Sequence, residues 1–383
     1  MALCSKHHKA KDKEGANNVL FLELLQVAVG VRSSLSCVPT AQDWAAIYHA
    51  AKMQAVTGVA FHGVHLLYQN KQEQLAFLPV GMKLQWLGLH ESLRAYNKVV
   101  NGAVSKLLAD EALADCHKVI LKGQAVAKYY PHPELRNPGD IDIWCVCRGM
   151  TLKESLWEMA RRAISKVPDA GMQPHHTDWP EVDGVSVELH FTPSTVYSFF
   201  YNRRVQRYFE ENLPRCKDNR LPIDVDIVFQ LMHLRRHLIS EGVGLRQVMD
   251  LYWTLKAYSL QCRRENVSVS SSLETTLKRL GLFSFAQAMM WVLQEVFLMP
   301  TEELLCAPNK KRGRFVLGEM LKGGNFGKWS TQNGEVGDNR MQHLWYYVRL
   351  AMRCLRYFTR ESVCAPMYRV YVGVWNRKFN SLR

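Results

Sequence analysis

The chain has 383 residues, of which 48% are apolar, so it is long enough for two or three domains, and global disorder is excluded. Its formal net charge of +14 favours anionic partners such as nucleotides, nucleic acid or a membrane surface, without choosing between them. The N-terminus lacks the apolar stretch of a secretory signal, no apolar run reaches about 18 residues, and no CxxC pair occurs. We therefore expect a reduced, cytoplasmic protein with no transmembrane segment.

The first hundred residues are predicted to be helical after a polar, flexible tail over residues 1–17. Within an N-terminal helical region at 18–106, the segment from Asp43 to Tyr68 has helical spacing with a possible break near Gly58. A long amphipathic helix is expected from Gly81 to Leu113.

Residues 107–213 differ in character, because short apolar strands alternate with helices. Strands are expected at 117–123, 140–147 and 185–191, with helices at 124–130 and 151–167. This alternation indicates an α/β or α+β core.

A polar stretch precedes the last of these strands. Asp183-Gly184 predicts a hairpin turn, and we expect His175 and His176 to lie in a hairpin loop.

The remainder is predicted as a helical domain at 214–306, followed at 307–383 by a loop and a basic, aromatic helical segment. Residues 307–340 are rich in Gly, Lys and Asn, which favours a loop. From Arg340 to Arg383, arginines and Lys378 far outnumber the single acid, Glu361. This mixture suits nucleic acid, a membrane surface, or a helix docked on the protein's own acidic cleft, and a docked helix is the commonest outcome.

Two predicted strands carry carboxylates on one face. Side chains alternate along a strand, so Asp140 and Asp142 share one face while Ile141 and Ile143 point into the core. In the later strand, Glu188 shares a face with Ser186 and His190. If the strands are neighbours, Asp140, Asp142 and Glu188 converge, and clustered carboxylates suit Mg²⁺ or Mn²⁺.

Upstream of these acids, a strand, Gly123 and a helix starting near Gln124 follow one another, an order that suits phosphate binding. This order resembles the nucleotidyltransferase superfamily typified by DNA polymerase β. More narrowly, roughly residues 30–300 resemble its uncharacterised nucleotidyltransferase family. The matching motifs are Lys122-Gly123, Tyr130-Pro131, Arg136, Gly139-Asp140-Ile141-Asp142, Val187-Glu188-Leu189-His190, and the segment from Gly244 to Asp250.

The resemblance implies an α+β fold, with a small mixed β-sheet nucleotidyltransferase core flanked by helical N-terminal and C-terminal segments. It implies that Asp140, Asp142 and Glu188 are catalytic and hold Mg²⁺ or Mn²⁺, with Glu188 as a possible base. A nucleoside triphosphate, with ATP favoured, would be the donor. Its phosphates would meet residues of the Gly123 turn and nearby cations, namely Lys122, Gly123, Gln124, Arg136 and Arg246.

One departure from the superfamily is Gln124, which stands where a serine usually follows the glycine. Phosphate binding would then depend on backbone N–H groups, Lys122 or Arg136.

Alternatives stay open for several residues. Lys122 could be a surface lysine, and Arg136 could form an ion pair with Glu134 or Asp140. His190 could contact the acceptor or the metal shell, or be a core histidine bonded to backbone, and Arg246 could pair with Asp250 four residues on. His233 and His237 have the spacing of two zinc ligands on one helix. The glutamate that follows the first histidine in the zinc motif HExxH is missing here, so helix packing or cleft lining is favoured.

The leading hypothesis is therefore a metal-dependent nucleotidyltransferase that releases pyrophosphate, with a small molecule, a protein or RNA as the acceptor. A degenerate nucleotidyltransferase that binds nucleotide or nucleic acid is the first alternative. A glycosyltransferase is the second, but no nucleotide-binding Rossmann-like domain precedes the D-x-D. Two clustered carboxylate strands beside Gly123 in a small mixed sheet would favour the first two hypotheses.

Overall fold

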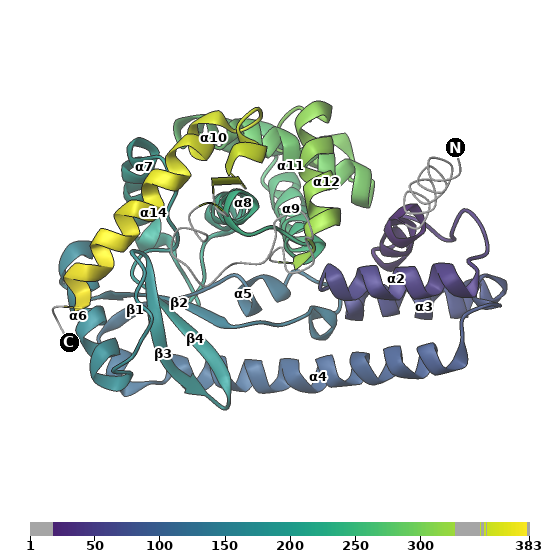
Figure 1. The fold of residues 1–383 in the computed structure, drawn as a ribbon, viewed down its shortest axis with the longest axis horizontal. Coiled ribbons are helices and arrows are strands. Elements are labelled where there is room, and N and C mark those ends of the chain that lie inside the picture. The colour runs from purple at the N-terminus through teal and green to yellow at the C-terminus, as the bar shows by residue number, and fades with distance from the viewer. Residues whose placement is uncertain (1–17, 326–344, 346–347, 350, 381–383) are drawn as a thin grey trace.

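The computed structural model describes residues 18–325, 345, 348, 349 and 351–380. The predicted flexible tail at 1–17 lies outside these residues. The described chain is an α+β fold in which a small sheet lies against a larger helical part (Figure 1).

The N-terminal region is helical, as predicted. A helix over residues 18–28 precedes α2 (Ala41–Met53), α3 (Thr57–Asn70) and the long α4 (Val80–Leu108). The break falls at residues 54–56, and Gly58 lies in the first turn of α3, where its Cα lies close to the Leu135 carbonyl. α4 extends beneath both α3 and the sheet, so it joins the N-terminal helices to the core (Figure 1).

The sheet has four strands in the order β1-β2-β4-β3. They are β1 (Cys116–Leu121), β2 (Ile141–Cys147), β3 (His176–Val182) and β4 (Val185–His190), with α5 (Gln124–Ala127) and α6 (Leu152–Lys166) in the connections. β2 and β4 are parallel, and the outer strands are antiparallel to their neighbours, so the sheet is mixed.

The two faces of the sheet pack on different helices. Ile141, Ile143, Val187 and Leu189 face α4 and α6 in one apolar cluster, as the alternation predicts. Trp144 and Val146, on the opposite face, join the larger core formed by the helical part. Asp142 and Glu188 share the second face, so they point toward the helical part rather than away from it.

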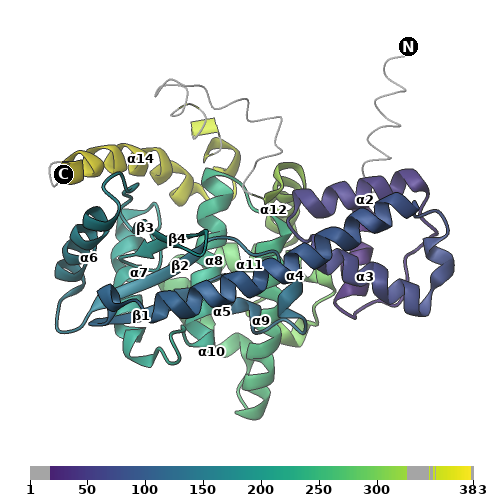
Figure 2. The ribbon, with the colours of Figure 1, turned by 90° about the horizontal axis from the view of Figure 1, so that it is seen from below.

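The helical part follows β4. It comprises α7 (Phe199–Asn212), α8 (Ile223–Ser240), α9 (Leu245–Arg264), α10 (Val269–Arg279) and α11 (Phe283–Phe297), and α12 (Lys310–Gly323) packs against α11. In Figure 1 these helices lie above the sheet and α4 lies below it, and Figure 2, seen from below, shows α4 crossing in front of them.

The last described helix, α14 (Thr359–Asn380), docks on the protein. Its Glu361 accepts a hydrogen bond from the Tyr197 amide at 2.8 Å and lies 3.6 Å from Arg235 in α8. Tyr368 packs edge-on against Tyr197. α14 is therefore a docked helix, which is one of the three arrangements that the sequence left open. It docks on α8 and the loop before α7 rather than on an acidic cleft.

Two expectations about local structure are wrong. Residues 310–323 form a helix instead of a loop, because Gly313, Val316, Leu317 and Met320 give it a buried face; the rest of the predicted loop, from residue 326, lies outside the described residues. His176 begins strand β3 instead of lying in a loop. β3 is an edge strand, and its polar residues obscure the alternation of apolar and polar side chains from which a strand is predicted. The hairpin turn at Asp183-Gly184 is confirmed, with positive φ at both residues.

No helix within the described residues is both long enough and apolar enough to cross a bilayer.

Candidate functional site

Three carboxylates meet where β2 and β4 run side by side. Asp142 is the register partner of Glu188, and Asp140 lies just before β2. One oxygen from each of Asp140, Asp142 and Glu188 lies within 4.8 Å of the others. The sequence prediction that these acids converge on one face is therefore confirmed.

The burial of the three acids differs. The Asp142 side chain is 1% exposed, that of Glu188 is 29% exposed, and Asp140 is open to solvent. Oδ2 of Asp142 has no hydrogen-bond partner among the described residues. A buried carboxylate oxygen without a partner is costly, and a cation is the partner that a cluster of three acids would favour. The donor set fits a hard divalent ion.

The only ammonium that contacts these acids within the described residues belongs to Lys122. Its Nζ lies 2.9 Å from Oδ1 of Asp142. Burial alone would lower the pKa of Lys122, but the charges of Asp142, Asp140 and Glu188 outweigh burial and raise it. Lys122 is thus a charged neighbour of the acids, and neither a plain surface lysine nor a lysine poised to lose its proton.

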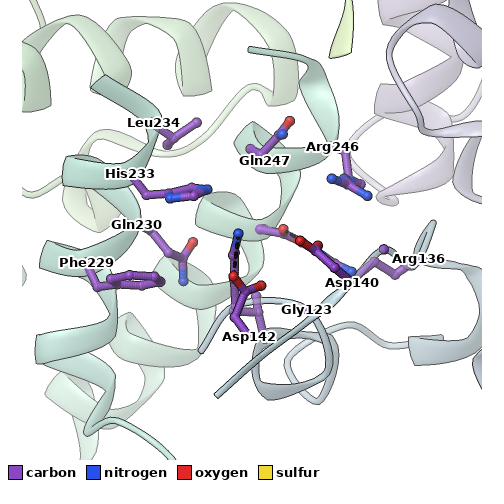
Figure 3. Close-up of a pocket in the computed structure, with 14 residues that line it drawn as sticks. Gly123, Arg136, Asp140, Asp142, Phe229, Gln230, His233, Leu234, Arg246 and Gln247 are labelled. Carbon is purple, nitrogen blue, oxygen red and sulfur yellow. Dashed lines mark hydrogen bonds and ion pairs between the residues drawn. The ribbon is translucent and has the colours of Figure 1, made fainter. Parts of the chain in front are cut away.

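The turn after β1 brings backbone close to the site. Lys122 has a φ of 35° and Gly123 a φ of 50° with a ψ of −119°, a combination that glycine adopts most readily. Gly123 lines the same pocket as Asp140 and Asp142 (Figure 3). Helix α5 is only four residues long, so its dipole adds little. Gln124 is absent from the pocket lining, and its amide donates to Asn101 of α4 at 2.5 Å.

Arg136 is held in a buried ion pair. Its Nε and Nη2 donate to the two oxygens of Asp250 at 2.7 and 2.8 Å, and Tyr130 donates to the same carboxylate at 2.6 Å. The partner is thus neither Glu134 nor Asp140. The pair lines the pocket and ties the loop before β2 to α9.

The far wall of the pocket comes from α8 and α9. Arg246 reaches over the loop before β2, where its Nη1 donates to the carbonyls of Asn137 and Pro138 at 3.3 Å. Phe229, Gln230 and His233 of α8 face the acids from the opposite side (Figure 3). His233 stacks on Phe229, and burial lowers its pKa well below the usual range. His233 therefore lines the cleft, which is one of the interpretations favoured from the sequence.

Sequence reasoning placed His190 on the face of Glu188 but missed the cluster that it forms with His175 and His176 beside the acids. His190 donates from Nε2 to Asp142 at 2.9 Å, and His176 Nδ1 lies 3.3 Å from Glu188. The ring of His175 lies 4.2 Å from that of His176. The register of β3 against β4 brings these rings together, and only a strand prediction for β3 would have shown it.

The acids and histidines set one another's protonation. Burial would raise the pKa of Glu188, but its hydrogen bond with His190 and nearby positive charge lower it to about 2. Burial lowers the pKa of His176 to about 4. For His190, burial is outweighed by hydrogen bonds to Asp142 and Glu188, so its pKa rises. At neutral pH, Glu188 is ionised and His176 is neutral.

A small mixed sheet with clustered acids on two parallel strands, a glycine turn beside them and helices above defines a nucleotidyltransferase-like class of α+β protein. It favours the two nucleotidyltransferase hypotheses over a glycosyltransferase. A model of the family described as uncharacterised nucleotidyltransferase matches residues 40–298, more than half of the chain, so the protein belongs to that family. Neither the curated proteins nor the solved structures include a match.

Proposed function

We propose that the protein is a metal-dependent nucleotidyltransferase, which transfers a nucleoside monophosphate from a triphosphate to an acceptor and releases pyrophosphate. The convergence of Asp140, Asp142 and Glu188 beside Lys122 carries this proposal. Membership of a nucleotidyltransferase family supports the general reaction class.

Asp140, Asp142 and Glu188 would hold Mg²⁺ or Mn²⁺, since their donor atoms are all oxygens. Such an ion neutralises phosphate charge and lowers the pKa of an attacking oxygen. The unpartnered Oδ2 of Asp142 is the observation in this chain that supports a cation here.

The chain's own residues would position the triphosphate. Lys122 would move its ammonium from Asp142 to a phosphate once a cation takes its place, a small change for a flexible side chain. The glycine at 123 leaves room for phosphate oxygens next to the backbone. Arg246 lies on the opposite rim, where a guanidinium suits the same oxygens.

Glu188 is better suited to holding a cation than to removing a proton. Its carboxylate lies with those of Asp140 and Asp142, and its Oε2 lies 3.5 Å from Nε2 of His190, so it is already engaged by positive and metal-binding groups. We therefore propose that Glu188 orients the metal and that its role as a base is minor.

The acceptor stays open between a small molecule, a protein hydroxyl and RNA. ATP is the proposed donor, and the net charge of +14 is compatible with a nucleic acid partner.

A second candidate function is a nucleotide-binding module that no longer catalyses transfer. Gln124 favours it, because this residue replaces the usual serine and directs its amide to Asn101 rather than into the pocket. Under this function, triphosphate binding persists and no transfer occurs.

Calorimetric titration of each common nucleoside triphosphate with Mg²⁺ tests the proposal. We expect metal-dependent binding by the wild-type protein, loss of binding in Asp140→Asn/Asp142→Asn, and retention in Asp169→Asn, which changes an exposed acid outside the cluster. Absence of binding to every triphosphate would contradict both functions.

A further inference from the structure

The histidines beside the acidic cluster form a geometric set of their own. His176 and His190 are direct partners across the antiparallel pair β3–β4, so their side chains leave the sheet on the same face. Glu188, two residues before His190, shares that face. Two imidazoles and one carboxylate therefore converge from two hydrogen-bonded strands, which are rigid supports.

The separations of the ligand atoms suit a bound metal ion. Oε2 of Glu188 lies 3.3 Å from His176 Nδ1 and 3.5 Å from His190 Nε2, and one ligand atom from each residue lies within 4.8 Å of the others. Ligands at 2.0–2.2 Å from a tetrahedral ion are separated by about 3.3–3.6 Å. Three protein ligands leave one position open, as in catalytic zinc sites.

Polar atoms without partners occur at the same place. Oδ2 of Asp142 and Nδ1 of His190 are buried, and neither has a hydrogen-bond partner among the described residues. Oδ1 of Asp142 lies 2.9 Å from His190 Nε2, so the unpartnered oxygen belongs to a carboxylate in direct contact with the set. Buried orphan atoms of this kind point to a missing partner.

Positive groups also face this region and limit the affinity for a cation. Lys122 pairs with Asp142, and Arg236 of α8 lies 2.5 Å from Nε2 of His175. The side chain of His175, next to His176, is therefore already in contact with Arg236. Glu188 and Asp142 supply the negative charge that opposes these cations.

We propose that His176, Glu188 and His190 form a second metal site, distinct from the all-oxygen set. Imidazole ligands suit Zn²⁺ or Co²⁺ and disfavour Mg²⁺. Glu188 is shared between the two sets, so it would bridge them. A metal ion on His190 Nε2 replaces the proton that this nitrogen donates to Asp142. The ring then binds as a neutral imidazole with its proton on Nδ1, so an imidazolium releases one proton to solvent and a neutral ring moves its proton from Nε2 to Nδ1. The site needs no nucleotide, so the inference goes beyond the proposed function.

The test uses full-length protein stripped of metal, without nucleotide or Mg²⁺. Co²⁺ is the probe, because four-coordinate Co²⁺ with nitrogen ligands absorbs visible light far more strongly than the hydrated ion. We expect one equivalent of Co²⁺ to bind with this absorption. His176→Gln and His190→Gln should each weaken binding at least tenfold, whereas His117→Gln, an exposed histidine on β1, should not.

X-ray absorption of the Zn²⁺-loaded wild-type protein needs no variant and keeps the test decisive if a variant fails to fold. Two imidazole nitrogens in the zinc shell are expected. A shell of oxygens alone, or equal loss of Co²⁺ binding in His117→Gln, would overturn the proposal. Absence of triphosphate binding with an intact Co²⁺ site would instead overturn the proposed function and leave this site standing.

Discussion

Lys122 occupies the place beside Asp142 that a cation would take in the proposed enzyme, with its Nζ 2.9 Å from Oδ1. We predict that Lys122→Met raises the affinity for Mn²⁺ without nucleotide about tenfold, because a competing positive charge is removed. The same change should weaken triphosphate binding. Calorimetry measures both effects, with Lys98→Met on the exposed side of α4 as the control. Unchanged Mn²⁺ affinity would show that Lys122 does not compete with the metal.

Asp226, in the first turn of α8, is a buried acid outside the candidate site. Burial raises its pKa from 3.8 to about 7. The folded state therefore holds a proton that the unfolded state releases, and stability falls as the pH rises from about 4 to about 7. At pH 8 the cost is at most about 4 kcal/mol.

Asp226→Asn should remove this pH dependence. We expect the variant to be more stable than wild type at pH 8, with the difference shrinking toward pH 4, in urea unfolding at several pH values. A constant difference across this range would contradict the raised pKa.

At the scale of elements, the turn from β1 to α5 depends on glycine. Because Gly123 combines a φ of 50° with a ψ of −119°, Gly123→Ala should destabilise the protein by about 1–3 kcal/mol. Gly102→Ala, at an exposed position in the C-terminal third of α4, is the matched control, with nothing within 4 Å of the added methyl. It should stabilise by about 0.5–1 kcal/mol. Thermal unfolding measures the stability of both variants. Equal effects of the two substitutions would show that the turn does not require glycine at position 123.

The Arg136–Asp250 pair links the loop before β2 to α9. Asp250→Asn leaves a buried guanidinium without its counter-charge and should cost about 3–5 kcal/mol. Asp224→Asn, which removes the partner of the more exposed Arg215, should cost less than about 1 kcal/mol. Chemical denaturation measures both, and similar losses would mean that the buried pair does not carry this link.

The same elements show what the sequence could predict. The alternation of Ile141 and Ile143 with Asp140 and Asp142 was sufficient to orient β2, because one face had to enter an apolar core. The partner of Arg136 could not be predicted, since Asp250 lies 114 residues away and only tertiary packing brings them together. β3 was missed for a related reason: an edge strand with polar outward residues has no clear period, and the histidine cluster depends on its register.

At the scale of the whole molecule, the candidate site lies between two parts that differ in kind. The apolar face of the sheet packs on α4 and α6, and its acids lie on the other face, where residues of α8 and α9 complete the pocket lining. In Figure 1, α4 lies below the sheet and α8 and α9 lie above it. α14 adds a further helix on α8, and none of its described side chains lines the pocket. The site therefore depends on how the two parts meet, more than on any one element.

A crystal structure with Mn²⁺ and a non-hydrolysable ATP analogue, in which anomalous scattering locates the metal, tests the proposed site most directly. We expect a Mn²⁺ peak within bonding distance of Asp140, Asp142 and Glu188, with the phosphates toward Lys122 and Gly123. Nucleotide and metal bound elsewhere, with Lys122 still paired to Asp142, would contradict the proposed site.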